Sequence, residues 1–537
     1  MKDAIARSER VRGLLAGLIH GLLMYLAFPP IGLWGCALAA PLPLLLLLGP
    51  AVRRPGLVGL AAAAGTLPMW MFEHHWVLRV SELGYWPLVA YCAGWTWAFI
   101  WIASGVGRRW RGARRLLWVV AVWTGLDYLR GSVIAGGYPW YFVSEPLIAV
   151  PGVAEIASVV GQHGVTAMVV LMVVSLMMVA GGRDRRVGVR GVVGVSIAAG
   201  VLIWTGVLTS TSPTGKPVRI AVIQTNVPSD NKTGWTIPAQ LRDFARVSQL
   251  TREAAAANPD LIVWPETMLP GAPADPESVA TARRHMIYRT YEDEAGVDRE
   301  LGETFFADQV AVLQAEVDTP MLIGAKAADG LRFERVGETG LQEFSDGMFN
   351  SVLVVARSRV QTQRYDKVHL TPFGETMPLI SAWPWLERRL LSLGAHGMLF
   401  DLSAGDRIEV LRLELASGVE VLVGTPICFE STVSRVCRAL VRGRGGGGAE
   451  LLINLTNDGW FGDSDRMREQ HLLLARWRCA ELGRPMVRAA NTGVSAFIDA
   501  RGSVIARGVD TDAVGARVEG ILVAEVTPTG GLTIFAR

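Results

Sequence analysis

The run RIAVIQTNV at residues 219–227 is followed by a helical pattern over residues 239–257 and then by LIVWP at residues 261–265. Further strand-like apolar runs lie at residues 321–325, 350–356, 419–427, 451–455, 487–499 and 520–526, and a second helical pattern covers residues 468–483. Strands that alternate with helices predict α/β layers rather than a β-sandwich or a helical bundle. We therefore expect residues 217–530 to form one large α/β domain.

The part of the chain before this domain has a different composition. Up to Ser210 there are 17 Lys and Arg against 8 Asp and Glu, whereas the remainder holds 35 against 41. The mean hydropathy of +0.31 excludes a disordered or fibrous protein and indicates membrane segments. Because the α/β part has no basic excess, nucleic acid is not expected as a partner.

Seven stretches before residue 211 are apolar and long enough for a membrane crossing, which takes about 20 residues. They are residues 12–28, 31–49, 56–72, 86–106, 115–134, 160–180 and 191–210. Lys and Arg gather at the N-terminus and near residues 53–54, 108–115 and 183–190, whereas the alternate loops hold only Arg79 between them. Since cytoplasmic loops carry the positive charges, residues 1–210 are predicted to form about seven membrane helices with a cytoplasmic N-terminus, and the α/β domain to lie outside.

One loop between these stretches is rich in aromatic residues and glycine. Residues 136–140, GGYPW, lie between the fifth and sixth predicted spans. Tyr and Trp are frequent where a membrane meets water. The pattern predicts an aromatic anchor at the membrane surface.

Three short runs each place a reactive side chain after an expected strand, which is where sites are built in α/β folds. VWPET at residues 263–267 contains Glu266, YDKVHLTPFGE at 365–375 contains Lys367, and GTPICFE at 424–430 contains Cys428. A carboxylate, an amine and a thiol together make a covalent catalyst. The thiolate attacks a carbonyl, the carboxylate carries the proton and the ammonium stabilises the oxyanion. The eight His are dispersed, so no metal site is expected.

The order Glu, Lys, Cys in WPE, YDKVHLTPFGE and ICFE resembles the nitrilase, or carbon–nitrogen hydrolase, superfamily. LLINLTNDGWFG at 451–462 and RPMVRAANTGVS at 484–495 also resemble it. Together with the polytopic N-terminal part, the whole chain resembles the apolipoprotein N-acyltransferase family, the membrane branch of that superfamily. The resemblance implies an αββα sandwich on the outer, periplasmic face of a bacterial inner membrane.

The same resemblance implies an activity and its partners. An acyl chain passes from a glycerophospholipid to the α-amino group of the S-diacylglyceryl cysteine at the N-terminus of an apolipoprotein, by a ping-pong cycle through a Cys428 thioester. The partners implied are the phospholipid donor, the diacylglyceryl apolipoprotein and the bilayer. We expect a monomer without a cofactor.

By matching position, the resemblance makes Glu266 the general base, Lys367 the oxyanion stabiliser and Cys428 the nucleophile. The residues it implies as supporting or substrate-binding are Glu375, Glu430, Trp235, Asn350 and Phe429. Phe429 stands where the family commonly has Tyr, which removes only a hydroxyl. Its backbone amide is a second candidate oxyanion donor.

Two other classes of function remain open at this point. A membrane-tethered amidase or nitrilase would keep the same triad but release acyl groups to water. A non-enzymatic membrane scaffold would need the triad to be broken, and it is intact.

Lys326 is a rival for the catalytic amine. Cys437 and Cys479 are either paired or, as we expect, buried free thiols.

Three segments complete the sequence-based picture. Residues 378–400, rich in Trp and Leu, follow PFGE directly and predict either a lid on the bilayer surface or a buried helix of the α/β core. Residues 271–320 form a long charged insertion to which no chemistry is assigned. GLTIFAR at 531–537 matches a run that precedes a last membrane helix in the family, and these 537 residues do not contain that helix.

Overall fold

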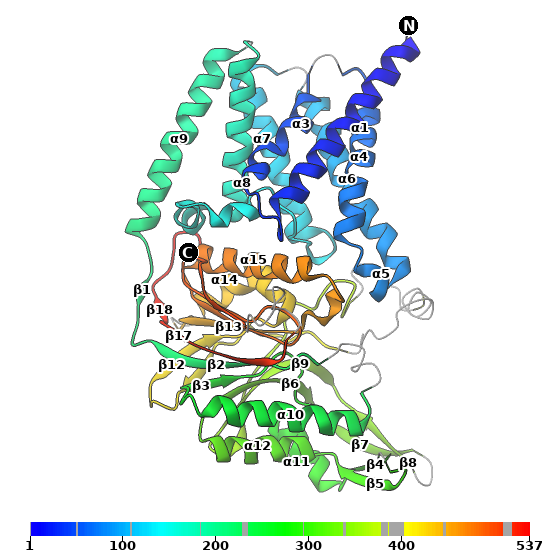
Figure 1. Ribbon diagram of the computed structural model, residues 1–537, viewed down its shortest axis with the longest axis vertical. Helices are drawn as coiled ribbons and strands as arrows, with labels where there is room; N and C mark the ends of the chain where they lie inside the picture. The colour runs from blue at the N-terminus through cyan, green and yellow to red at the C-terminus, as the bar shows by residue number, and fades with distance from the viewer. Residues whose placement is uncertain are drawn as a thin grey trace.

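The computed structural model describes residues 2–49, 52–107, 110–182, 184–227, 235–293, 295–336, 340–376, 385, 402–443, 447–508 and 518–537. Within these ranges the chain forms a helical bundle followed by an α/β sandwich, stacked along the long axis of the molecule (Figure 1). The N-terminus lies at the end of the bundle that is farthest from the sandwich, and the C-terminus lies where the two parts meet (Figure 1). All but residue 385 of the predicted lid segment, 378–400, lies outside the described residues.

Five helices in the described bundle are long and apolar enough to cross a membrane. They are α1 (Lys2–Ala27, apolar from Arg7), α4 (Pro55–Glu73), α6 (Glu82–Gly107), α8 (Val153–Ala180) and α9 (Arg185–Leu208). They coincide with five of the seven stretches predicted from the sequence. The remaining two stretches differ from a simple spanning helix.

The second predicted span, residues 31–49, is divided into two short helices. These are α2 (Gly35–Ala39) and α3 (Pro41–Leu46), which together cover only about 18 Å at 1.5 Å per residue, against a hydrocarbon core of about 30 Å. The fifth predicted span is the 17-residue α7 (Gly112–Tyr128), extended by a π-helical turn at Leu129–Val133. The number of membrane crossings therefore stays a prediction.

Glycines bring the backbones of α1 and α4 into contact. A Cβ atom added at Gly17 would lie 2.0 Å from the carbonyl oxygen of Ala62, and one added at Gly65 would lie 2.2 Å from that of Leu14. Because lipid tails are as apolar as the side chains, membrane helices associate through such close packing at small residues. This contact fixes α4, whose last residue reaches the sandwich.

The sandwich contains two six-stranded mixed sheets. The first has the order β10 (Arg359–Asp366), β9 (Gly347–Ala356), β6 (Met321–Asp329), β3 (Leu261–Val263), β2 (Val218–Gln224) and β17 (Gly520–Val526). The second has the order β11 (Leu411–Glu414), β12 (Glu420–Gly424), β13 (Leu451–Thr456), β14 (Met486–Ala490), β15 (Ala496–Ile498) and β16 (Val504–Arg507). The central strands β2, β3 and β6 run parallel, as do β12, β13 and β14.

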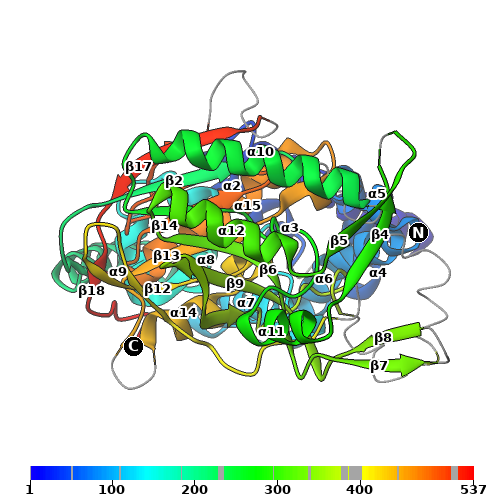
Figure 2. The ribbon, with the colours of Figure 1, turned by 90° about the horizontal axis from the view of Figure 1, so that it is seen from below.

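Helices cover the outer faces of both sheets. The helices α10 (Ile237–Ala255), α11 (Pro276–Arg284) and α12 (Phe305–Val317) lie on the side away from the bundle (Figures 1 and 2). The helices α14 (Ser434–Arg442) and α15 (Asp465–Leu482) lie between the second sheet and the bundle (Figure 1). The predicted αββα arrangement is therefore confirmed. The 271–320 insertion supplies α11, α12 and the hairpin of β4 (Tyr288–Glu292) with β5 (Asp298–Gly302).

Two further two-stranded sheets complete the described strands. The first pairs β1 (Ser212–Pro213) with β18 (Thr529–Gly530), next to the end of α9. The second pairs β7 (Arg332–Val336) with β8 (Gly340–Phe344).

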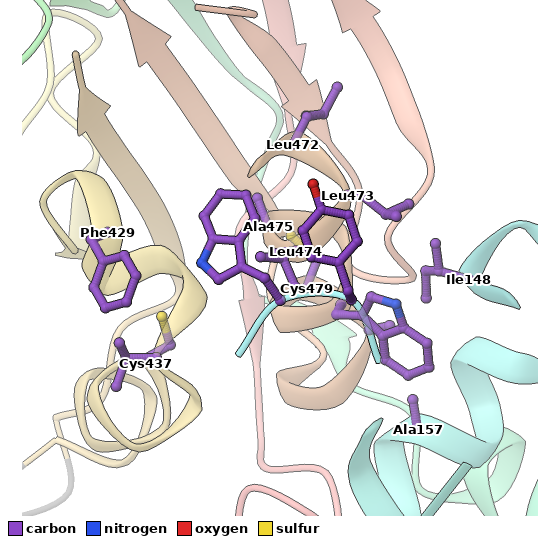
Figure 3. Close-up of a cluster of buried hydrophobic side chains, with 14 of the residues drawn as sticks. Ile148, Ala157, Phe429, Cys437, Leu472, Leu473, Leu474, Ala475 and Cys479 are labelled. Atoms are coloured by element: carbon purple, nitrogen blue, oxygen red, sulfur yellow. The ribbon is translucent and has the colours of Figure 1, made fainter. Parts of the chain in front are cut away.

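Helix α15 is buried on both sides because it forms the junction of the two parts. Figure 3 shows Leu472–Cys479 of this helix between Phe429 and Cys437 on one side and Ile148 and Ala157 of the bundle on the other. Buried polar groups pair across the junction. The indole of Trp477 donates to the carbonyl oxygen of Glu145 at 2.9 Å, and the backbone N–H of Gln162 donates to Glu481 at 2.8 Å.

The prediction of an aromatic anchor at the membrane surface, over residues 136–140, is wrong for Trp140. Trp140 is only 3% exposed and packs against Phe461 and His471 of the sandwich instead of facing lipid. The sequence shows the aromatic residues of this loop but not the second surface that covers them. The loop is part of the junction.

We expect Gly17→Ala to destabilise the bundle by about 1–3 kcal/mol, because the new methyl group must push α1 away from α4. The measurement is the midpoint of thermal unfolding in detergent. Gly94→Ala on α6 is the matched control, since a Cβ there meets no atom within 4 Å. Equal midpoints for the two variants would contradict the close α1–α4 packing.

Candidate active site

The three reactive residues predicted from the sequence follow strands of both sheets. Glu266 lies three residues after β3, Lys367 follows β10 directly, and Cys428 begins the 3-10 turn Cys428–Thr432 after β12. The strands β3 and β10 point the same way, because β10 and β6 both run antiparallel to β9. The first sheet thus brings a carboxylate and an amine to one edge, and the second sheet contributes the thiol.

Lys367 is the centre of a buried charge cluster. Its Nζ atom lies 2.6 Å from Oε2 of Glu375 and 3.6 Å from Oε1 of Glu266. Burial alone disfavours the charged amine, but the two carboxylates outweigh this effect and hold the pKa of Lys367 above its ordinary value. The amine is therefore an ammonium at neutral pH, and the ion pairs to Glu266 and Glu375 are made by Lys367 rather than by Lys326.

Amide groups orient the two carboxylates. The side chain of Asn350 on β9 donates to Glu266 at 2.7 Å and reaches Glu375 at 3.4 Å. The backbone N–H of Asn457 donates to the other oxygen of Glu266 at 2.8 Å, and that of Thr371 donates to Glu375 at 2.8 Å. Asn350 is thus a direct hydrogen-bond partner of both acids.

Cys428 is buried and its backbone is strained. It is 9% exposed, and its φ of +50° lies in the left-handed region that residues with a Cβ rarely adopt. Burial and the negative charge of Glu266 raise the pKa of the thiol to about 12, against the opposing charge of Lys367. The charges of Glu266 and Lys367 thus have opposite effects on the pKa of this thiol, and attack by the thiolate requires a base.

Glu430 joins the Lys367 segment to the Cys428 turn. One of its oxygens accepts from the backbone N–H groups of Val368 and His369, and the other accepts from the N–H of Ile427 and the hydroxyl of Tyr365, all at 2.8–2.9 Å. Burial raises the pKa of Glu430 to about 7. Four hydrogen bonds to protein groups make this residue part of the scaffold of the site.

The other predicted supporting residues differ in position. The ring of Phe429 stacks on His369, with 5.9 Å between ring centroids. Trp235 contacts α10, where its indole donates to Asp243 at 2.7 Å. The structure therefore joins Phe429 to the segment after Lys367, whereas Trp235 bonds to the first turns of α10, the helix that follows it.

Several residues of the site escaped individual prediction. Asn457 holds Glu266, and the side chain of Asn454 donates to the carbonyl oxygens of Pro426 at 2.7 Å and Cys428 at 3.3 Å. Both lie in LLINLTNDGWFG, the run whose resemblance to the superfamily was the available signal. Asn457 acts across the two sheets and Asn454 acts between neighbouring strands of the second sheet, and no single run reveals such contacts.

The cysteines of the chain do not pair with one another. Cys36, Cys92, Cys428, Cys437 and Cys479 are all free. Cys437 and Cys479 are buried thiols, as expected. In the described part of the chain there is no group of three or more His, Cys, Asp or Glu that could hold a metal ion.

Comparison with known proteins covers both parts of the chain. Residues 219–530 match the model of the carbon–nitrogen hydrolase family, and residues 20–177 match that of the apolipoprotein N-acyltransferase N-terminal domain. The apolipoprotein N-acyltransferase of Geobacter metallireducens is 30% identical over 94% of this chain and 87% of its own length. That of Gloeobacter violaceus is 28% identical over 100% of this chain and 92% of its own.

The Vibrio vulnificus apolipoprotein N-acyltransferase is 26% identical over 98% of this chain and 93% of its own length. The similarity thus extends through the bundle and the sandwich together. The chain belongs to the apolipoprotein N-acyltransferase family, and its sandwich is a carbon–nitrogen hydrolase domain.

Proposed function

We propose that this protein transfers an acyl chain from a glycerophospholipid to the α-amino group of the N-terminal S-diacylglyceryl cysteine of apolipoproteins, through a thioester on Cys428. The observation that carries the proposal is the Lys367 ammonium, paired with Glu266 and Glu375 beside the buried Cys428 thiol. Family membership and five apolar helices make the chain a multi-pass membrane enzyme. Both substrates carry lipid chains, so they are delivered by the bilayer.

In the first half-reaction Glu266 takes the proton of the Cys428 thiol as the sulfur attacks the carbonyl carbon of the phospholipid ester. Lys367 stabilises the negative charge that develops on the carbonyl oxygen. When the tetrahedral intermediate collapses, the ester C–O bond breaks and Glu266 returns the proton to the leaving glycerol oxygen. The products are a thioester on Cys428 and a lysophospholipid.

In the second half-reaction the α-amino group of the apolipoprotein attacks the thioester. Glu266 takes the proton of the amine, the C–S bond breaks, and the sulfur of Cys428 recovers a proton. The product is an amide, and the enzyme returns to its starting state. Water competes with the amine for the thioester, so a reaction centre that is buried and next to the membrane favours transfer over hydrolysis.

The ion pairs of Lys367 explain how Glu266, the proposed base, and Lys367, the proposed oxyanion stabiliser, can lie close together without neutralising each other. Glu375 holds the ammonium at 2.6 Å, whereas Glu266 lies at 3.6 Å and is bound instead by Asn350 and Asn457. Glu375 therefore supplies most of the counter-charge. This division leaves Glu266 available to exchange a proton with Cys428.

The cellular location is part of the proposal. The positive loops at the N-terminus and near residues 53–54, 108–115 and 183–190 support a cytoplasmic N-terminus in a bacterial inner membrane. The N-terminus and the sandwich lie at opposite ends of the molecule (Figure 1). The sandwich then faces the periplasm, where diacylglyceryl apolipoproteins present their N-termini.

Cys428→Ser is expected to abolish the covalent acyl-enzyme, because an ordinary hydroxyl is a far weaker nucleophile than a thiol. The purified protein is incubated with phospholipid and a diacylglyceryl peptide, and the masses of protein and peptide are measured. The wild type should gain one acyl group transiently and pass it to the peptide. Cys437→Ser is the matched control and should retain both steps. Equal loss from the two variants would refute the assignment, and hydrolysed lipid without acylated peptide would favour an amidase.

Glu266→Gln is expected to have opposite effects on two properties of Cys428. Burial and the charge of Glu266 hold the thiol pKa at about 12, so removal of the charge lowers that pKa and speeds alkylation by iodoacetamide at pH 8. Acyl-enzyme formation should nevertheless fall by at least about 100-fold, because the general base is lost. Both rates are measured by mass spectrometry. Slower alkylation of the variant across the pH range would contradict the proposed proximity.

Orientation is tested in the full-length chain with two new cysteines. Val312 on α12 is 59% exposed on the sandwich, and Arg186 is exposed at the start of α9. A maleimide that does not cross membranes should label Val312→Cys in intact cells with a permeable outer membrane. It should label Arg186→Cys only after lysis. The reverse pattern would place the sandwich in the cytoplasm.

A further inference from the structure

The backbone of Cys428 is held by side chains that do not belong to the Lys367 charge cluster. Its carbonyl oxygen accepts from the hydroxyl of Ser431 at 2.9 Å and from the side chain of Asn454 at 3.3 Å. A left-handed φ at a residue with a Cβ persists only where its surroundings enforce it. These hydrogen bonds are part of what fixes the position of the sulfur.

A buried histidine lies behind Ser431. The Nε2 atom of His471 is 3.3 Å from the Ser431 hydroxyl, and its Nδ1 atom is 2.9 Å from Oδ1 of Asp458. Arg488 reaches Asp458 at 2.6 Å and Asn454 at 2.8 Å, which closes the network around the Cys428 carbonyl. The proposed reaction uses none of these side chains directly.

The membrane bundle packs against this network at His471. The ring of His471 packs against Trp140 at 5.6 Å between centroids, and Trp140 is 3% exposed. Trp140 comes from the loop between α7 and α8, where Tyr138 stacks beside it at 6.3 Å and bonds to His74 of the bundle at 2.5 Å. The contact is therefore anchored in the membrane part.

The same loop reaches the other half of the site. A Cβ at Gly136 would lie 3.1 Å from the ring of Pro372, which belongs to the turn between Lys367 and Glu375. The bundle thus contacts both segments that carry the reactive groups. The sandwich by itself would lack these contacts.

We propose that Trp140 is a positioning residue for the reaction centre, acting on Cys428 through His471 and Ser431. The proposal rests on the proposed function, in which Cys428 is the nucleophile. Its physical basis is that nucleophilic attack depends steeply on alignment, so a small shift of the Cys428 carbonyl moves the sulfur away from the lipid ester. The membrane bundle then contributes to catalysis as well as to substrate delivery.

The test uses the full-length protein with Trp140→Leu, His471→Asn, His471→Gln and Ser431→Ala. We expect Trp140→Leu, His471→Asn and Ser431→Ala each to slow acyl-enzyme formation about tenfold with the KM for phospholipid unchanged. His471→Gln should recover part of the rate, because its amide reaches the position of Nε2, whereas that of Asn reaches only Nδ1. In the double variant Trp140→Leu/His471→Asn, acyl-enzyme formation should be about as slow as in either single variant, since both substitutions act on one chain of contacts.

Alkylation of Cys428 by iodoacetamide at pH 8 provides a second readout. When the contacts to the Cys428 backbone are loosened, water reaches the buried thiol and the pKa of the thiol falls. Alkylation of Cys428 should therefore become faster while its acylation becomes slower. This readout does not require transfer, and failure of the positioning contact is thereby separated from failure of the proposed function.

Trp86→Leu is the matched control, because Trp86 on α6 is 59% exposed on the bundle surface. Wild-type rates in Trp140→Leu, or equal changes in Trp86→Leu, would overturn the proposal. Ser431→Ala removes only a hydroxyl, so a wild-type rate in this variant would also overturn it, even if Trp140→Leu proved unstable.

Discussion

The buried ion pairs of Lys367 are the constraint on which the active site depends. Its side chain is 1% exposed, and an ammonium held out of water is costly unless carboxylates and hydrogen bonds compensate for its lost hydration. Glu375 and Glu266 supply the charge, while Asn350 fixes the carboxylates. The cluster is assembled from β3, β9 and the segment after β10, so it exists only when the first sheet is complete.

The second sheet adds the thiol to this cluster through fixed backbone contacts. Glu430 accepts hydrogen bonds from backbone N–H groups of both the segment after Lys367 and the residue before the Cys428 turn. Asn457, which follows β13, donates to Glu266. Glu430 and Asn457, both from the second sheet, thus connect the two layers at the candidate active site.

The junction with the bundle imposes a second constraint, because α15 has no solvent-exposed face. Its sequence, DRMREQHLLLARWRCAEL, contains many charged residues and resembles a surface helix. In the fold some of these polar residues bond to the bundle: Arg466 pairs with Glu73, and Arg478 bonds to Gln162. Others, such as Glu469 with Arg507, pair within the sandwich. The α/β sandwich and the membrane helices are therefore one packed structure at this layer.

Local patterns predicted most of the helices and strands and singled out the candidate reactive residues. The alternation of apolar runs and helical patterns predicted α/β layers, and the resemblance to the nitrilase superfamily implied that these layers form an αββα sandwich. The helices α10 and α15 lie within a few residues of their predicted ranges. Hydropathy indicated the long helices but gave 31–49 as one span, because it averages over the break between α2 and α3. The aromatic loop at 136–140 was placed at the membrane surface because its covering surface is distant in sequence.

The amino-acid sequence by itself determined the α/β character of the second part and the apolar, helical character of the first 210 residues, and it predicted Glu266, Lys367 and Cys428 as the reactive side chains, because each of these is encoded in local runs. Only the tertiary structure decided that Glu375 rather than Glu266 is the nearer partner of Lys367, that Asn457 binds Glu266, and that Trp140 packs against His471. These facts are distances between segments separated by up to several hundred residues, and such distances arise from packing rather than from any local pattern.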